Sequence, residues 1–232
     1  MQTTSKILMV RPIKFGFNEQ TAGNNAFQVQ GIEQTNVGAK AIAEFDNFVK
    51  LLRDAGVEVN VIQDTAEPHT PDSIFPNNWF SRHADGTVVL YPMFAPNRRL
   101  ERKPAVLDFL RTYHSPKKEV DLTHWESKNI FLEGTGSMIL DREHNFIYAC
   151  ASIRTQKEAL QELSKAIGYD YFLFDAIDQN GKPIYHTNVL MCVGEKFILS
   201  CMEAIHNSEE KAKFVEYAKK FNKEIIEISY EQ

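Results

Sequence analysis

The chain has 232 residues, 43% hydrophobic and 25% charged, which is enough apolar content for one compact α/β domain over residues 1–232. Its net charge of −5 excludes a basic nucleic-acid surface, and no apolar run approaches the roughly 20 residues of a membrane-spanning helix. Three cysteines, all in apolar segments, favour reduced thiols over a disulfide framework. We therefore predict a cytoplasmic protein without nucleic-acid or membrane partners.

The N-terminal segment is predicted to hold a strand at 7–10, a helix with Ile42, Phe45, Val49 and Leu52 on one face, and a strand at 57–61. Residues 15–36, between the first strand and the helix, are polar, rich in Gly and Asn, and too long for a simple connector. We interpret them as a binding loop or lid.

Three longer units follow, and they begin with similar motifs about 55 residues apart: Ile74-Phe75-Pro76-Asn77-Asn78, Ile130-Phe131-Leu132-Glu133-Gly134 and Ile184-Tyr185-His186-Thr187-Asn188. Each copy is predicted to run through a polar-ended strand, a tight turn, an apolar strand, an amphipathic helix and a closing strand. A fixed period of this size indicates units that are stacked or arranged radially.

Apolar strands are predicted at 87–91, 146–150 and 197–201, and closing strands at 119–122, 171–174 and 224–228. The first helix is expected to begin at Pro104, the second at a capping box over 155–158, and the third at an N-cap on Ser208. The N-terminal segment lacks the first strand of its hairpin. The sequence thus predicts three full ββαβ units and one partial unit.

Metal and nucleotide sites find little support in the sequence. The histidines form no H-x-x-x-H pair and no C-x-x-C occurs, so we expect no zinc site. Gly134-Thr135-Gly136 lacks the third glycine or Gly-Lys-Ser/Thr of a phosphate loop and leads into an apparent strand. We therefore expect neither a metal nor a cofactor.

Polar residues stand at equivalent places in the three motifs: Asp72, Asn77 and Asn78 in the first, Glu133 in the second and His186 in the third. Radially arranged repeats bring equivalent positions to a common axis, so an acid for a cation, a second acid and a histidine would meet there. Taken singly, each residue also fits a structural role in a turn or at a strand end.

These motifs, with 71–75, 95–99 and Arg154-Thr155, resemble the guanidino-group modifying (pentein) superfamily of arginine deiminases, amidinotransferases and dimethylarginine dimethylaminohydrolases. The likeness is greatest to the amidinotransferase-related branch associated with citrulline use, which shares an Asn-Asn-Ala-Phe loop like 24–27. The resemblance implies an α/β propeller of five ββαβ units around a polar channel.

The resemblance also implies roles for single residues. Asp72 would bind a guanidinium or ureido group beside Phe75, with Asn77 and Asn78 standing where the dimethylarginine branch has acids. His186, held by Glu133, would protonate the leaving amine and then activate water or a second amine. Arg99 and Arg154 would hold a substrate carboxylate, although both also fit ordinary solvated charges.

In the superfamily a cysteine thiolate attacks the guanidinium carbon and forms a covalent thiouronium. That cysteine lies beyond the unit with the histidine, and Cys150, Cys192 and Cys201 do not match its position. We therefore expect a further C-terminal unit, with the nucleophile beyond residue 232. The alternatives are a non-catalytic guanidino- or ureido-binding pseudoenzyme, or a structural fragment that forms a homo-oligomer through open edges. Hydrolysis and transfer to a second amine both remain open.

Overall fold

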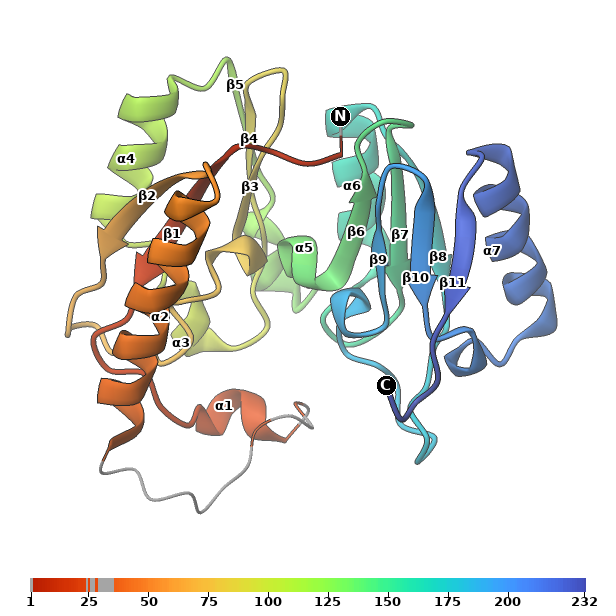
Figure 1. The fold of residues 1–232 in the computed structure, drawn as a ribbon, viewed down its shortest axis with the longest axis horizontal. Coiled ribbons are helices and arrows are strands. Elements are labelled where there is room, and N and C mark those ends of the chain that lie inside the picture. Colours follow the sequence, from red (N-terminus) through yellow and green to blue (C-terminus); the bar gives the residue numbers. More distant parts are fainter. Residues whose placement is uncertain (1, 24, 26–27, 29–35) are drawn as a thin grey trace.

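The computed structural model describes residues 2–23, 25, 28 and 36–232. It is a mixed α/β structure (Figure 1), as predicted. In the described part of the chain the strands form four separate sheets rather than one continuous sheet.

The N-terminal unit is a parallel pair of strands covered by one long helix. Strand β1 (Lys6–Arg11) pairs with β2 (Glu58–Gln63), and α2 (Val37–Asp54) buries Phe45 and Val49 against them. The short helix α1 (Glu19–Ala22) lies in the long loop between β1 and α2. The two predicted strands and the predicted helix are therefore present.

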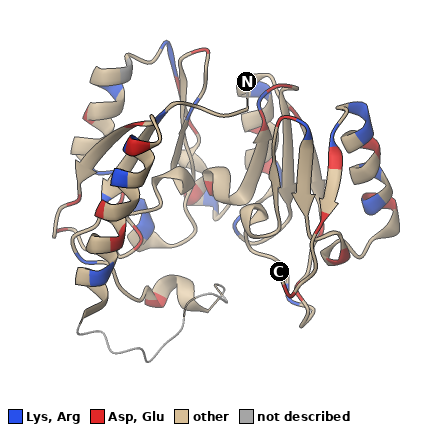
Figure 2. Ribbon diagram, in the orientation of Figure 1, with Lys and Arg blue, Asp and Glu red and all other residues tan. Residues whose placement is uncertain are grey.

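The other three sheets share one topology, in which the first two strands are antiparallel and the second pairs parallel with the third. They consist of β3 (Phe80–Arg82), β4 (Thr87–Leu90) and β5 (Lys118–Asp121); β6 (Met138–Asp141), β7 (Phe146–Cys150) and β8 (Asp170–Phe174); and β9 (Met191–Val193), β10 (Phe197–Ser200) and β11 (Glu224–Glu227). The helices α4 (Pro104–His114), α6 (Lys157–Ile167) and α7 (Ser208–Lys220) connect the second strand of each sheet to the third. Charges of both signs lie along α2, whereas α7 has acids in its first turn and lysines in its last (Figure 2).

The repeated motifs are short helical turns that precede the first strand of each sheet, and the prediction of strands at these positions was wrong. The turns are η2 (Pro76–Asn78), α5 (Gly134–Ser137) and η4 (Thr187–Val189). Pro76 fixes the first residue of η2, and Gly134 opens α5 with a φ of 47° that suits glycine. Turn α5 packs against both η2 and η4, so the three motifs meet in space.

Two of the predicted helix starts are also corrected. The capping box over 155–158 does not form, because Thr155 stays extended in backbone bridges to Leu132 and Ser152 and the N-cap is Gln156. The cap of α7 is Asn207, whose side chain accepts from the first-turn amides. Pro104 begins α4 as predicted.

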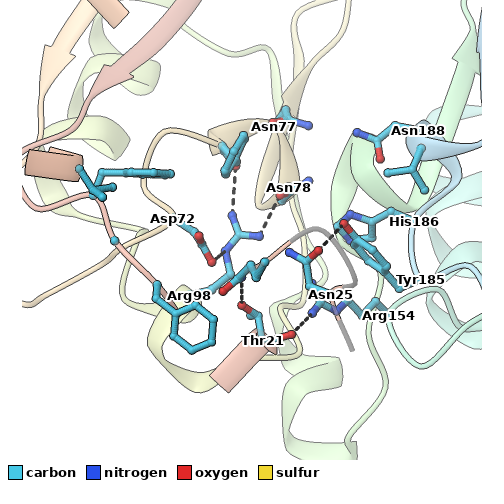
Figure 3. Close-up of a pocket in the computed structure, with 17 residues that line it drawn as sticks. Thr21, Asn25, Asp72, Asn77, Asn78, Arg98, Arg154, Tyr185, His186 and Asn188 are labelled. Atoms are coloured by element: carbon cyan, nitrogen blue, oxygen red, sulfur yellow. Dashed lines mark hydrogen bonds and ion pairs between the residues drawn. The ribbon is translucent and has the colours of Figure 1, made fainter. Parts of the chain in front are cut away.

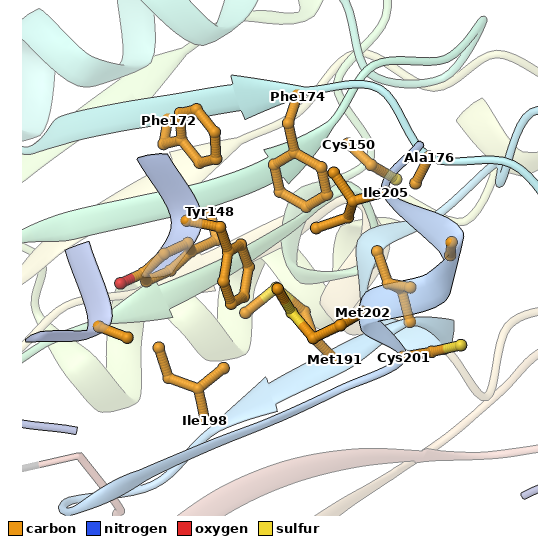
Figure 4. Close-up of a cluster of buried hydrophobic side chains, with 14 of the residues drawn as sticks. Tyr148, Cys150, Phe172, Phe174, Ala176, Met191, Ile198, Cys201, Met202 and Ile205 are labelled. Carbon is orange, nitrogen blue, oxygen red and sulfur yellow. The ribbon is translucent and has the colours of Figure 1, made fainter. Parts of the chain in front are cut away.

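Strand β7 is buried on both faces, which agrees with its continuous apolar sequence. Tyr148 and Cys150 pack on one face, among side chains of the sheet formed by β9, β10 and β11. Ile147 and Ala149 pack on the other face, against Leu160 of α6. Figure 4 shows Cys150 and Cys201 among apolar side chains of this core. Further short helices, α3 (Pro96–Arg99), η3 (Thr123–Lys128) and η5 (Met202–Ala204), lie in the connections. Among the described residues, no helix combines the length and apolar character needed to cross a membrane.

Candidate functional site

A cavity of about 470 Å³ lies between the N-terminal loop and the repeated turns. The lining comes from segments far apart in the sequence, and Asp72 and Arg98 face His186 and Arg154 from opposite sides of it (Figure 3). Six of the predicted site residues line it: Asp72, Phe75, Asn77, Asn78, Arg154 and His186.

The predicted pair of Glu133 and His186 forms behind the cavity wall. His186 Nε2 lies 2.8 Å from Glu133 Oε2, and both side chains are buried. Glu133 also accepts the backbone N–H of Phe94 at 2.9 Å and lies 3.4 Å from Arg154 Nη1. The carboxylate is therefore fully engaged by donors, and it orients the imidazole ring.

The protonation of this pair follows from burial and from the neighbouring charges. Burial acts to raise the pKa of the Glu133 carboxyl, but the hydrogen bond from His186 and the charges of Arg154 and Arg98 outweigh burial and lower that pKa. Burial lowers the pKa of His186 below 6.5 against the raising influence of Glu133. At neutral pH Glu133 is thus ionised and His186 neutral, with its proton on Nε2.

Two glycines of α5 allow the motifs to approach this closely. A Cβ on Gly134 would lie 2.2 Å from the carbonyl oxygen of Asn77. A Cβ on Gly136 would lie 2.4 Å from Asn78 Nδ2 and 2.8 Å from His186 Nδ1. Real Cβ atoms do not approach so closely, so both positions require glycine if Asn78 and His186 are to keep their places.

The opposite wall is built around Asp72, which is 8% exposed. Asn18 Nδ2 donates to Asp72 Oδ2 at 2.7 Å, and Arg98 Nε lies 3.8 Å from the same oxygen. Asn18 in turn accepts from Asn97 Nδ2 at 2.7 Å. Asp72 therefore offers a carboxylate that the N-terminal loop holds in place beside the cavity.

The structure places Arg98, and not Arg99, at the cavity. Arg98 is buried, donates to Asn78 Oδ1 at 2.9 Å and pairs with Glu101 at 2.8 Å. Arg99 turns away and donates to the carbonyl oxygens of Met93 and Phe94. A signal for Arg98 exists in the sequence, because Glu101 follows it by three residues, the spacing of side chains on one helical face.

The N-terminal loop contacts the second wall as well. Arg154 Nη2 lies 3.5 Å from the carbonyl oxygen of Thr21, and Tyr185 Oη donates to Asn25 Oδ1 at 3.0 Å. The Arg154 guanidinium lies over the Tyr185 ring, 5.0 Å from its centroid. Phe15, Phe17 and Gln28 of the predicted binding loop also line the cavity. Residues 24, 26–27 and 29–35 of that loop, with most of the Asn-Asn-Ala-Phe motif, lie outside the described residues.

Comparison with known proteins decides the family. A family model described as "N,N dimethylarginine dimethylhydrolase, eukaryotic" matches residues 11–232, almost the whole chain. The chain belongs to this family. The predicted relation to the guanidino-group modifying (pentein) superfamily is thereby confirmed. A comparison with curated protein sequences gave no match.

Solved structures similar to this dimethylhydrolase-family chain show the same fold at low identity. The N-terminal domain of ArgZ, covalently bound to a reaction intermediate, has a TM-score of 0.69 and 15% identity, with 96% of this chain and 75% of that domain covered. ArgZ is an arginine dihydrolase from the ornithine–ammonia cycle in cyanobacteria. The ternary complex of AgrE with ornithine and NAD+ has a TM-score of 0.71 and 20% identity, and the match covers 97% of this chain and 31% of the AgrE chain.

The dimethylarginine enzyme of Pseudomonas aeruginosa, as a cysteine-to-serine mutant complexed with citrulline, has a TM-score of 0.64 and 16% identity. The match covers 97% of this chain and 76% of the Pseudomonas aeruginosa enzyme. At these identities the likeness establishes the fold and leaves function to the site itself.

The three cysteines of this family member lie away from the cavity lining. Burial raises the pKa of the Cys150 thiol to about 11, and burial also raises that of Cys201. Cys192 is exposed on β9. No group of three or more His, Cys, Asp or Glu side chains in residues 2–23, 25, 28 and 36–232 is arranged to hold a metal ion.

Proposed function

We propose that this protein binds the guanidino or ureido group of an arginine- or citrulline-like small molecule in the cavity and takes part in its covalent modification. The observation that carries the proposal is the Glu133–His186 pair at the wall of the cavity that also contains Asp72 and Arg154. A carboxylate for the planar cation, an arginine for a carboxylate and a proton-transfer pair are the groups that such a substrate needs.

Asp72 accepts N–H groups of the ligand, while Phe75 covers an apolar face of it. Asn77 and Asn78 accept or donate without adding charge, which suits a ureido group as well as a guanidinium. Arg154 attracts the carboxylate end of the ligand. Arg98 lines the cavity in place of Arg99, where it pairs with Glu101 and holds the Asn78 amide.

The reaction proposed for this site begins with a cysteine thiolate that forms a C–S bond to the guanidinium or ureido carbon. His186 takes up the thiol proton as the thiolate forms, and the resulting imidazolium gives this proton to the leaving amine as its C–N bond breaks. Neutral His186 then removes a proton from water or a second amine, which attacks the thiouronium and breaks the C–S bond. Glu133 stabilises the His186 imidazolium that each of these proton transfers forms.

The thiolate is proposed to come from outside these 232 residues, on a unit that would complete a five-unit α/β propeller. The placement of all three cysteines away from the cavity supports this proposal. The same observation favours a second candidate, a guanidino- or ureido-binding protein without catalysis. The negative charge and the family both fit a cytoplasmic location.

Isothermal titration calorimetry with L-arginine and L-citrulline tests the binding. We expect the 232-residue protein to bind one of them, and Asp72→Ala to weaken binding at least about tenfold, or 1.4 kcal/mol. Asp46→Ala is the matched control, since Asp46 is an acid on α2 that pairs with Arg11 away from the cavity. Absence of binding to both ligands would contradict the proposal.

Release of ammonia or amine separates the two candidates. A polypeptide that includes the next segment of the reading frame should release it, and His186→Ala in that polypeptide should abolish release while it remains folded. Binding without release by the longer polypeptide would favour the binding protein. Release by the 232-residue protein would contradict the external cysteine.

A further inference from the structure

Both members of the Glu133–His186 pair are attached to one buried residue, Ser137. Ser137 Oγ accepts the backbone N–H of Glu133 at 2.8 Å and donates to the carbonyl oxygen of Arg154 at 2.6 Å. The carbonyl oxygen of Ser137 accepts the hydroxyl of Thr187, the residue after His186. The side chain of Ser137 thus holds Glu133, and its backbone holds the segment of His186.

Thr187 completes this attachment from the other side. Its hydroxyl donates to Ser137 O and accepts the backbone N–H of Cys150 at 2.8 Å. Ser137 and Thr187 are both wholly inaccessible to solvent, so water cannot replace either partner. The hydroxyl therefore joins the end of β7, the end of α5 and the chain beside His186.

We propose that Ser137 and Thr187 are positioning residues that set the geometry, and hence the protonation, of the Glu133–His186 pair. Neither residue lines the cavity, so they act through the pair and not on a ligand. The 2.8 Å contact between His186 Nε2 and Glu133 Oε2 joins two segments 53 residues apart, and Ser137 is the point at which both are fixed. The significance of this role for catalysis rests on the proposed function, whereas the geometric claim does not.

The expected signature is the tautomer of His186. With Glu133 ionised and in place, neutral His186 carries its proton on Nε2 and donates it to Glu133. If Thr187 loses its hydroxyl, Ser137 O and Cys150 N–H lose their partner and the two segments can shift. The imidazole then samples the Nδ1–H tautomer, and its N–H proton exchanges with water more readily.

The test is nitrogen-15 NMR of the histidine rings in the unliganded 232-residue protein, with His186 assigned from His186→Gln. Thr187→Val is expected to mix the tautomers and to speed exchange of the ring N–H at least tenfold. Thr187→Ser should restore the wild-type signals because it keeps the hydroxyl. Ser164→Ala is the remote control, since it removes a hydroxyl that binds the carbonyl oxygen of Tyr169.

Ser137→Ala provides a second route if Thr187→Val does not fold. Glu133 N–H keeps a second acceptor, the carbonyl oxygen of Arg154 at 3.2 Å, so this variant retains part of the local structure. It should show the same mixed tautomers. A folded Thr187→Val or Ser137→Ala with the wild-type tautomer and exchange rate would overturn the proposal. Because no ligand is used, failure of the binding experiment would leave this result unaffected.

Discussion

His186 and His83 are buried to the same extent, at 6% and 5% exposure, yet they have different partners. His186 Nε2 lies 2.8 Å from a carboxylate oxygen at the cavity wall, whereas His83 Nε2 lies 3.0 Å from the Ser81 hydroxyl, and His83 does not line the cavity. Burial lowers the pKa of His83 to about 4, with Arg142 acting in the same direction. Burial alone therefore does not distinguish the two histidines, whereas a charged partner beside an open cavity does.

The substitution with the largest expected effect is the one that removes Glu133, the charged partner of His186. Glu133→Ala leaves the Arg154 guanidinium buried without its carboxylate, and we expect the free energy of unfolding to fall by about 3–5 kcal/mol. Urea denaturation monitored by circular dichroism measures this. Asp46→Ala, which breaks an exposed pair, should lower the free energy of unfolding far less. Equal losses in the two variants would show that the partner of His186 is not special.

The next effect concerns His83 and its dependence on pH. Because the folded pKa is about 4 and the ordinary value 6.5, the unfolded chain takes up the proton first as pH falls. The contribution of His83 to stability is therefore complete above pH 6.5 and lost toward pH 4, by up to roughly 3 kcal/mol. Urea denaturation from pH 7 to pH 4 measures it, and His83→Gln should remove this part of the slope. An unchanged slope in His83→Gln would assign the loss to other groups.

A smaller effect extends the comparison from histidines to thiols. Cys150, with a pKa of about 11, should react with iodoacetamide at pH 7.5 at least tenfold more slowly than exposed Cys192. Mass spectrometry of the alkylated peptides measures both rates in one sample. In urea the two rates should converge. Fast reaction of Cys150 in the folded protein would reopen it as a nucleophile.

The sequence predicted which residues come together better than it predicted their local structure. Asp72, Glu133 and His186 come together because equivalent positions in the repeats meet, which periodicity alone indicates. Arg98 was missed because one residue along a helical turn rotates a side chain by about 100°, so Arg98 and its neighbour Arg99 face different surroundings. The capping box at Thr155 was wrong because tertiary backbone bridges compete with a local cap.

The long loop shows a different limit of sequence reasoning. Its length and composition indicate binding, but they do not show that Asn18 reaches Asp72 across 54 residues or that Thr21 meets Arg154. Such contacts depend on how two distant segments are placed in space. Periodicity carries no information about them.

The Asn78 amide and the His186 ring both border the one spot that a Cβ of Gly136 would occupy, 2.4 Å from Asn78 Nδ2 and 2.8 Å from His186 Nδ1. Any side chain at residue 136 would therefore collide with the binding wall and the proton-transfer wall at once. Even Gly136→Ala would change both walls together, so no substitution at this residue can separate an effect on binding from an effect on proton transfer.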